Sequence, residues 1–239
     1  MNPIVEVQQI SKSFGATQAL RGVSFSFFSG EIFALVGANG AGKSTLIKII
    51  SGVEPPDQGS VTLEGNPLPM GRVHAVEQAG VIAVHQEPVV FPHLSTIDNV
   101  FVGREPGRLG GLWLDRDRMA RGARQVMHQL GEDLPLEQPV GELSRAQRQM
   151  VSIARALLND CRILILDEPT EGIQPNIVQQ IGDIISKLNQ ELGLTVLVVE
   201  QKLPFVKRVT NRFSIMTKGS IVADDEMPAL SDALIAEHL

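Results

Sequence analysis

The chain has 239 residues, 43% of them hydrophobic, so it is long enough to bury an ordinary core and is not a disordered polypeptide. Its formal net charge of −6 argues against a protein whose main task is to bind nucleic-acid phosphates. The single cysteine, Cys161, excludes an intrachain disulfide and a multi-cysteine zinc site. No apolar run approaches the roughly 20 residues needed to cross a bilayer, and the first residues carry no secretory signal, so we expect a cytoplasmic location.

The first 30 residues predict strands of an antiparallel region, most clearly at 23–27, where apolar and polar residues alternate. Residues 32–36 form a continuous apolar run, which is typical of a strand buried on both faces of a parallel sheet. A glycine-rich turn follows, and then a helix that begins near Gly42 and ends at Gly52. This order predicts an α/β core preceded by antiparallel strands.

Residues from about 88 to 160 have a polar, helical pattern interrupted by the loop 103–111, and we interpret them as a helical insertion in the α/β core. One helix of this insertion is expected to begin at Asp115. Another is expected to begin at Ser144 and to run to Ala156.

After the insertion, the apolar runs 163–166 and 194–199 predict two further buried strands. The helix between them carries apolar residues at intervals of three and four as far as Leu192, and Gly193 is a natural stop. Together they form a strand-helix-strand unit of a parallel sheet. The acidic run 224–226 is most simply a solvated turn.

Residues 37–44 match the phosphate-binding pattern G-x-x-x-x-G-K-[ST], directly after a predicted buried strand and at the start of a helix. In this pattern backbone N–H groups surround phosphate oxygens, Lys43 reaches the β and γ phosphates, and Ser44 supplies an oxygen to Mg²⁺. The residues expected to bind ATP here are Gly37, Ala38, Asn39, Gly40, Ala41, Gly42, Lys43, Ser44 and Thr45.

The strand at 163–166 ends in two adjacent acids, Asp167 and Glu168. Asp167 is expected to hold magnesium through its water shell, and Glu168 to polarise the water that attacks the phosphate. The alternative, a strand that leaves the core into polar surface, loses weight beside a phosphate loop.

Ser144 and Gln147 form a capping-box pattern at the start of a helix. A capped helix N-terminus exposes N–H groups that attract phosphate, and in a pair of facing domains it can close over the nucleotide held by the opposite phosphate loop. The alternative is an ordinary well-capped helix.

These motifs, in this order, resemble the ATP-binding cassette family over essentially the whole chain. The resemblance implies a P-loop NTPase (RecA-like) α/β core with an N-terminal antiparallel β subdomain and an inserted α-helical subdomain at about 88–160. It further implies that residues 1–239 form a single nucleotide-binding domain. The signature, which in this family acts on the opposite subunit, corresponds to Leu143, Ser144, Arg145, Ala146 and Gln147.

The same resemblance assigns further roles. Phe14 takes the position of the aromatic residue that stacks on adenine. Gln86 takes that of the glutamine that senses magnesium and the γ phosphate and couples the site to membrane-domain helices. Gln86 is therefore expected to act in catalysis with Lys43 and Glu168. It is also expected at the metal, with Ser44 and Asp167.

Three departures from the common family pattern bear on activity. Arg145 and Ala146 replace both glycines of the usual Leu-Ser-Gly-Gly-Gln signature. Glu200 occupies the switch position that is often histidine, which is expected to place a carboxylate near the γ phosphate. Residues 171–174 replace the usual Ser-Ala-Leu-Asp segment that communicates between two sites. A heterodimer with one stronger and one weaker site would suit these features.

The resemblance differs along the chain. Residues 1–169 are similar to ribose-type monosaccharide importer ATPases, and residues 170–239 to the urea and branched-chain amino-acid importer ATPases. We therefore expect an ATPase subunit, converting ATP and water to ADP and phosphate, that energises import of a small polar solute, first of all a monosaccharide. A urea or branched-chain amino-acid importer ATPase and a weakly hydrolysing regulatory subunit remain alternatives.

The resemblance also implies the partners: a second ATP-binding cassette, identical or different, integral-membrane permease subunits and a solute-binding protein. The chain would then sit on the cytoplasmic face of the membrane through the permease. A soluble cassette acting on nucleic acid or ribosomes is disfavoured, because the sequence has no basic arm and no long coiled coil. No nucleic-acid partner is expected.

Overall fold

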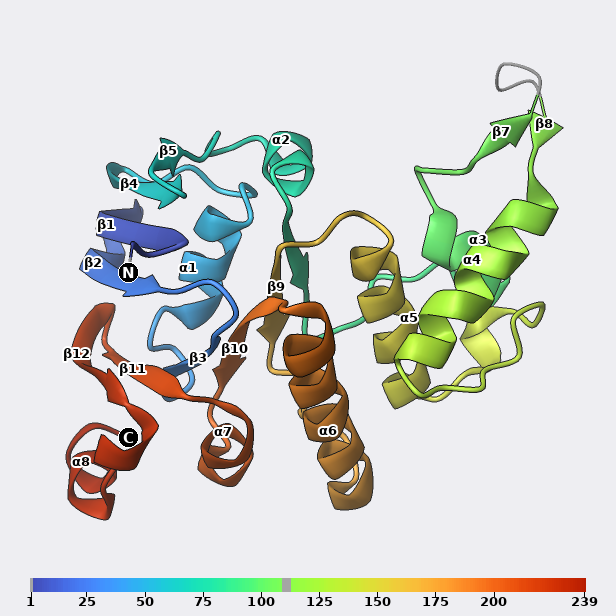
Figure 1. Ribbon diagram of the computed structural model, residues 1–239. Coiled ribbons are helices and arrows are strands. Elements are labelled where there is room, and N and C mark those ends of the chain that lie inside the picture. The colour runs from blue at the N-terminus through green and yellow to red at the C-terminus, as the bar shows by residue number, and fades with distance from the viewer. Residues whose placement is uncertain (1, 109–112) are drawn as a thin grey trace. The chain divides into compact units, whose positions relative to one another are not determined.

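The computed structural model describes residues 2–108 and 113–239 (Figure 1). They fall into two compact units, Met1–Ala83 with Arg162–Leu239, and Val84–Cys161. The second unit contains the segment 88–160, which is expected from the sequence to be an insertion. The expectation that the whole chain works as one nucleotide-binding domain stays a prediction. Within the described residues, no helix is both long enough and apolar enough to cross a membrane.

The first unit contains a four-stranded antiparallel sheet in the order β2-β1-β4-β5. Its strands are β1 (Val5–Phe14), β2 (Thr17–Phe27), β4 (Gln58–Leu63) and β5 (Asn66–Pro67). The antiparallel region expected in the first 30 residues is thus confirmed. Strands β4 and β5 were not predicted, because the first half of β4 is exposed and carries no apolar alternation.

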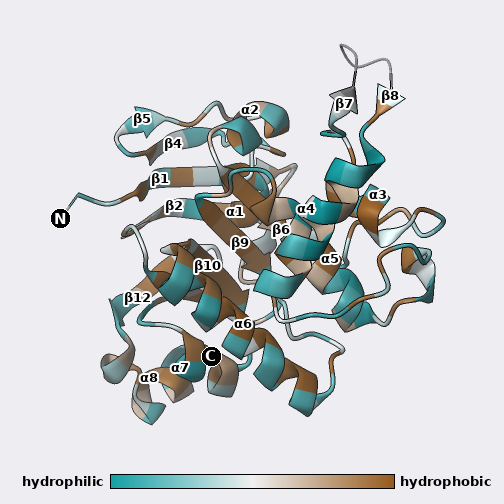
Figure 2. Cartoon of the chain, turned by 45° about the vertical axis from the view of Figure 1, so that its right-hand side comes forward, coloured by the Kyte–Doolittle hydropathy of each residue, from teal (hydrophilic) through white to brown (hydrophobic). Residues whose placement is uncertain are grey.

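A six-stranded sheet in the order β12-β11-β3-β10-β9-β6 forms the α/β core. Its strands are β3 (Ile32–Val36), β6 (Val81–Val84), β9 (Ile163–Asp167), β10 (Thr195–Glu200), β11 (Arg212–Thr217) and β12 (Ser220–Glu226). Strands β11, β3, β10 and β9 pair in parallel, and every residue of β3, β9 and β10 is buried. Burial on both faces explains their continuous apolar runs, drawn in brown for β9 and β10 in Figure 2.

The helices of the first unit are α1 (Lys43–Ile50), α2 (Val73–Gln78), α6 (Pro175–Leu192), α7 (Leu203–Val209) and α8 (Asp232–His238), with a 3-10 helix at Met227–Ala229. Helix α6 ends as predicted, because Gly193 adopts the left-handed conformation with φ 64°. Three phenylalanines, Phe25, Phe27 and Phe33, stack with ring centroids 5.6–6.3 Å apart and join β2 to β3 in the main core.

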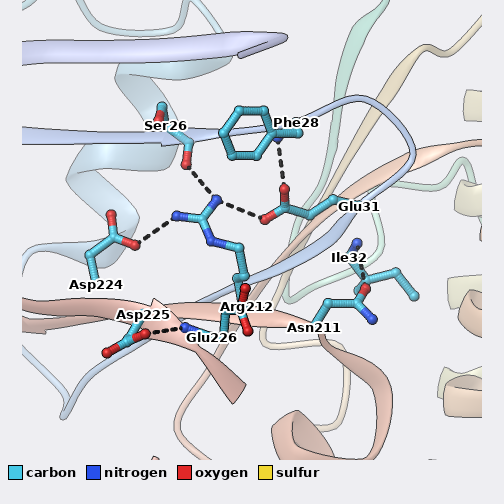
Figure 3. Close-up of polar contacts among 9 residues, drawn as sticks. All are labelled: Ser26, Phe28, Glu31, Ile32, Asn211, Arg212, Asp224, Asp225 and Glu226. Atoms are coloured by element: carbon cyan, nitrogen blue, oxygen red, sulfur yellow. Dashed lines mark hydrogen bonds and ion pairs between the residues drawn. The ribbon is translucent and has the colours of Figure 1, made fainter. Parts of the chain in front are cut away.

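Arg212 on β11 links the two sheets of the first unit (Figure 3). Its guanidinium donates to the Ser26 carbonyl oxygen, to Glu31 Oε1 at 3.2 Å and to Asp224 Oδ1 at 3.0 Å. It also lies 5.2 Å from the ring centroid of Phe28. The turn expected at 224–226 is therefore wrong, because these residues end strand β12 and Asp224 is an ion-pair partner in the fold; all three are exposed, as expected.

The second unit contains α3 (Thr96–Phe101), α4 (Arg116–Gln129), a 3-10 helix at Val140–Glu142, α5 (Arg145–Leu157), and the antiparallel strands β7 (Gly107–Arg108) and β8 (Trp113–Leu114). Helix α4 begins after Asp115, whose side chain caps it, as the sequence predicts. The loop expected at 103–111 includes β7, and its residues 109–111 lie outside the described part of the chain.

Candidate functional site

The phosphate loop, residues 37–44, connects β3 to α1, and Lys43 is the first residue of α1. Its side chain is only 3% exposed, and its Nζ donates to the carbonyl oxygens of Gly37 at 2.7 Å and Ala38 at 3.1 Å. It also lies 3.5 Å from Glu168 Oε1. The loop therefore folds around a cation whose present partners are neutral carbonyls and one carboxylate, all of which a phosphate group can replace.

Two glycines of the loop allow it to pack closely against neighbouring main chain. A Cβ atom on Gly37 would lie 2.4 Å from the Met216 carbonyl oxygen, and one on Gly42 would lie 2.8 Å from the Ala19 carbonyl oxygen. Gly42 has φ 108° and forms the N-cap of α1 without a side chain to cap the helix. The first N–H groups of α1 are thus left without a side-chain acceptor, which is the arrangement that binds anions.

A pocket of about 400 Å³ opens over this loop. Of the residues predicted to bind ATP, six line it, beside Glu168: Asn39, Gly40, Gly42, Lys43, Ser44 and Thr45. The pocket also includes residues that the sequence analysis missed, from the start of β2 and from the turn between β11 and β12. These are Thr17, Gln18, Ala19, Arg21, Lys218 and Gly219.

No local signal distinguishes the missed residues. Arg21 and Lys218 belong to strands and turns of ordinary composition, and both add positive charge to a pocket that already holds Lys43. The Arg21 backbone N–H donates to the Gly219 carbonyl oxygen at 2.8 Å, which ties β2 to the β11–β12 turn. Only the pairing of these distant segments brings them to the phosphate loop.

Phe14 ends β1 and is half exposed, with 50% of its surface accessible. It pairs with Thr17, a residue of the pocket lining, and Lys12 Nζ lies 5.5 Å from its ring centroid. An exposed aromatic ring next to the pocket-lining segment is available for stacking on a base. The position of Phe14 agrees with the role expected for it, which stays a prediction.

Asp167 is the last residue of the buried strand β9, and Glu168 follows it directly. Asp167 is 7% exposed, and the Glu168 side chain is 11% exposed. Glu168 has φ 47°, a left-handed conformation, and its N–H donates to the Val199 carbonyl oxygen at 2.8 Å. Burial raises the pKa of Glu168 above its ordinary value of 4.5, and Glu171 raises it further, whereas Lys43 lowers it. A raised pKa makes the carboxylate a stronger base.

The residues expected to hold Mg²⁺ divide between the two units. Ser44, with an exposed side chain in the first turn of α1, and Asp167, at the end of β9, belong to the first unit, whereas Gln86 belongs to the second. Hydroxyl, carboxylate and amide oxygens are ligands that Mg²⁺ accepts, so the chemistry of these donors fits the ion.

The signature residues form the start of α5 in the second unit. Ser144 Oγ accepts from the Gln147 N–H, and Gln147 Oε1 accepts from the Ser144 N–H, so the predicted capping box is present. Arg145 Nη2 donates to the carbonyl oxygen of Gln86 at 3.1 Å. Leu143 is buried, and Arg145 and Ala146 are half-buried.

Glu200 differs from the expectation that its carboxylate faces the γ phosphate. The side chain lies at the end of β10 and is 1% exposed. Both of its oxygens accept hydrogen bonds from the protein itself, from Thr170 and from the N–H groups of Gln201 and Lys202. It is therefore turned into the fold. Gln201, the next residue, is exposed.

Comparison with protein families identifies a match over residues 20–171 to the family described as ABC transporter. The matched segment begins at Leu20 in β2 and includes the phosphate loop and the capped helix α5. It ends at Glu171, four residues after the last residue of β9.

Curated relatives are similar over nearly the whole chain. The ribose import ATP-binding protein RbsA 2 of Streptomyces avermitilis is 37% identical over 230 residues, covering 96% of this chain and 45% of that protein. Ribose import ATP-binding protein RbsA 1 of Burkholderia thailandensis is 40% identical over 245 residues, covering 100% of this chain and 48% of that protein. The chain thus spans about half the length of these relatives.

Solved structures share the fold. The ADP conformation of MJ1267, an ATP-binding cassette of an ABC transporter, superposes with a TM-score of 0.87 at 27% identity, covering 99% of this chain and 98% of that one. The structure of cbiO1 from Clostridium perfringens, part of the ABC transporter complex cbiONQ, gives a TM-score of 0.83 at 25% identity, covering 99% and 92%. The α/β fold class expected from the sequence is confirmed.

Proposed function

The chain belongs to the ABC transporter family, and from this premise we propose that it binds ATP at the phosphate loop and hydrolyses it to drive import of a small solute. One observation carries the proposal. Lys43 lies between two loop carbonyls and 3.5 Å from Glu168 Oε1, beside a pocket of about 400 Å³. A cation and a base are thus held together next to a helix N-terminus that can receive phosphate.

Each residue of the site has a defined task in this reaction. The Lys43 ammonium exchanges its loop carbonyls for the β and γ phosphates, whose negatively charged oxygens are stronger acceptors than neutral carbonyls. Glu168 orients the attacking water and takes its proton, which its raised pKa favours. In the first unit, Ser44 and Asp167 would hold Mg²⁺, which when bound neutralises charge on the phosphate oxygens, and the metal role expected of Gln86 stays a prediction.

A second ATP-binding cassette completes the site. In the first unit the phosphate loop is exposed at Ala38, Asn39 and Gly40. The capping box of α5 uses the N–H groups of Ser144 and Gln147, and it leaves those of Arg145 and Ala146, between them, for the γ phosphate of an opposing copy. If the second cassette is an identical copy, the altered signature affects both ATP sites of the dimer. If it is a different chain, the altered signature affects one of them.

A monosaccharide is the solute that the relatives favour, because those described above are ribose import proteins. The similarity of residues 170–239 to urea and branched-chain amino-acid importer ATPases is the weaker guide, since it begins after the catalytic acids. The weakly hydrolysing alternative is disfavoured by the presence of Glu168 with a nearby Lys43.

The permease is proposed to dock on the segment that follows Gln86. This segment exposes three apolar side chains in the second unit, Val89 at 63%, Phe91 at 48% and Leu94 at 41%. The main chain of this segment is held by the fully buried side chain of Asn99. The amide oxygen of Asn99 accepts from the Phe91 N–H, and its NH₂ group donates to the carbonyl oxygens of Phe91, Leu94 and Ser95. An apolar surface on a prearranged loop suits a helix end of a membrane protein. The chain would thus sit on the cytoplasmic face of the membrane, with a solute-binding protein on the other side.

Co-purification tests the assignment. The tagged chain is expressed with either a ribose-type or a urea-type permease, and its recovery in detergent-solubilised membranes is measured. We expect preferential capture by the ribose-type permease, and loss of that capture when Val89, Phe91 and Leu94 are all changed to Ser, with basal ATPase retained. The matched control changes Leu192 and Val222, two exposed apolar residues of the first unit, to Ser. Preferential capture by the urea-type permease, unaffected by the triple change, would reassign the partner to the C-terminal segment.

A further inference from the structure

The carboxylate of Glu200 is buried, and among the described residues no cationic side chain is its hydrogen-bond partner. Its Oε1 accepts from the Thr170 N–H at 3.1 Å and from the Thr170 hydroxyl, and its Oε2 accepts from the N–H groups of Gln201 at 2.9 Å and Lys202 at 3.1 Å. Burial of a carboxylate is strongly unfavourable unless its oxygens are hydrogen-bonded, and four donors meet that requirement here. Such a group is expected to have a specific task.

Thr170 is the residue on which these contacts converge. It is fully buried, its N–H and hydroxyl both donate to Glu200, and its carbonyl oxygen accepts from Lys202 Nζ at 2.7 Å. Each of its polar groups is thus bound by Glu200, at the end of β10, or by Lys202, two residues later, and its carbonyl oxygen also accepts from the Ile173 N–H at 3.4 Å. We call the set of Glu200, Thr170 and Lys202 the Glu200 clasp.

The clasp holds the short segment that carries Glu168. Thr170 lies two residues after Glu168, and the Glu171 N–H donates to the Glu168 carbonyl oxygen at 3.1 Å. Glu168 itself adopts a left-handed backbone conformation with φ 47°. Such a conformation is uncommon and costly for a residue other than glycine, and surrounding contacts help to hold it. The segment has two such constraints from β10: the Val199 carbonyl oxygen, which accepts from the Glu168 N–H, and the clasp.

We propose that Glu200 is a positioning residue for ATP hydrolysis, which through Thr170 fixes the backbone that aims the Glu168 carboxylate at Lys43 and the phosphate pocket. Glu200 does not touch the nucleotide in this role. The inference deepens the proposed ATPase function and rests on it. A role limited to stability is the competing account, and the two differ in what they predict for turnover relative to nucleotide affinity.

Substitutions at Thr170 test the clasp with the smallest change of shape. Thr170→Val replaces the hydroxyl by a methyl group and leaves the N–H bond to Glu200, whereas Thr170→Ser keeps both. We expect Thr170→Val to lower kcat roughly ten- to hundredfold, because a displacement of the catalytic group by about 1 Å has effects of that size. The MgATP dissociation constant should stay within about twofold, because Lys43 and the phosphate loop are untouched. Thr170→Ser should restore kcat.

Thr210 provides the matched control. It is also buried in the first unit, and its hydroxyl donates to the Val206 carbonyl oxygen at 2.9 Å within α7. Thr210→Val therefore loses a buried hydroxyl hydrogen bond of the same kind away from the phosphate pocket. We expect it to lower the unfolding temperature without lowering kcat.

Glu200→Gln is the second variant. The amide has one acceptor oxygen and presents two N–H donors to groups that are themselves donors, so the clasp cannot be completed. Where this variant folds, as measured by circular dichroism, we expect loss of kcat with MgATP affinity preserved. Where it does not fold, the Thr170 series alone decides.

Two results overturn the proposal. Turnover by Thr170→Val at the parent rate would show that the clasp does not position Glu168. Equal losses in Thr170→Val and Thr210→Val, in step with their unfolding temperatures, would show a role in stability alone. Failure of the parent protein to hydrolyse MgATP would instead contradict the proposed function, and the positioning role would fall with it.

Discussion

Arg145 Nη2 donates a hydrogen bond to the main-chain carbonyl oxygen of Gln86 at 3.1 Å. The residue that stands in place of the first signature glycine thus holds the residue that the family resemblance assigns to sensing the γ phosphate. Arg155, near the end of the same helix, donates to the Val89 carbonyl oxygen. Helix α5 therefore contacts the start of the proposed permease-docking segment at two points, and the altered signature supplies one of them.

Arg145→Ala is expected to loosen this segment. A hydrogen bond from a charged donor contributes about 1.5–3 kcal/mol at most, and partial exposure reduces that contribution here. Amide hydrogen exchange at residues 86–89 should become faster, and stimulation of the ATPase by the permease should fall. MgATP affinity should not change, because Lys43 belongs to the other unit. Arg124→Ala, at an exposed position of α4, is the control. Unchanged exchange in Arg145→Ala would show that Arg155 holds the segment alone.

Lys43→Ala is expected to abolish turnover and to weaken MgATP binding by at least about tenfold, because charge-assisted hydrogen bonds contribute about 1.5–3 kcal/mol. The backbone donors of the loop cannot replace that charge. Isothermal titration calorimetry with MgATP measures the effect. Lys48→Ala removes an exposed lysine from the same helix and should bind as the parent does. Parent-like affinity and hydrolysis in Lys43→Ala would remove the phosphate-loop assignment.

Glu168→Gln is expected to bind MgATP but to lose about 10²–10⁴ in kcat, the usual contribution of a general base. The amide keeps the shape of the side chain and loses its basicity. Size-exclusion chromatography with ATP should show a trapped dimer. Glu191→Gln, at an exposed position of α6, should turn over normally. Hydrolysis by Glu168→Gln at the parent rate would mean that another group activates the water.

Glu31 is expected to make stability depend on pH through the Arg212 cluster. Burial raises the pKa of Glu31 above its ordinary value of 4.5, although the Phe28 N–H and Arg212 lower it. The folded protein then binds this proton more tightly than the unfolded chain does. The contribution of Glu31 to stability is therefore largest below pH 4.5 and falls as pH rises through the higher folded pKa.

Urea unfolding of the parent and of Glu31→Gln, at pH values from about 4 to 7, measures this effect, because the amide does not titrate. The unfolding free energy of the parent minus that of the variant should decrease as pH rises. Asp224, the other carboxylate on Arg212, has a pKa that partial burial likewise raises, so Asp224→Asn should give a difference of the same sign. A parent-minus-variant difference that grows with pH would contradict the assignment for that residue.

The sequence by itself determined the parts of this protein whose physics is local. The phosphate loop is recognisable because glycines, Lys43 and a helix start within eight residues, and the backbone geometry that binds phosphate arises within that segment. Strands β3 and β10 are continuous apolar runs because both of their faces are buried, and Ser144 with Gln147 forms its capping box over three residues. Each of these patterns can be recognised within one short segment of the sequence, although β3 and β10 are buried by parts of the chain that lie far away in the sequence.

Only the tertiary structure decided the features that join residues far apart in the chain. Strand pairing brings Arg21 and Lys218 to the phosphate pocket, and nothing in their own neighbourhoods indicates it. Glu200 occupies a strand end whose sequence is compatible with a side chain facing either the nucleotide or the core, and Thr170, 30 residues earlier, supplies the donors that draw it inward. A buried carboxylate takes the direction in which its hydrogen bonds are satisfied, and those donors are assembled only when β9 and β10 lie side by side.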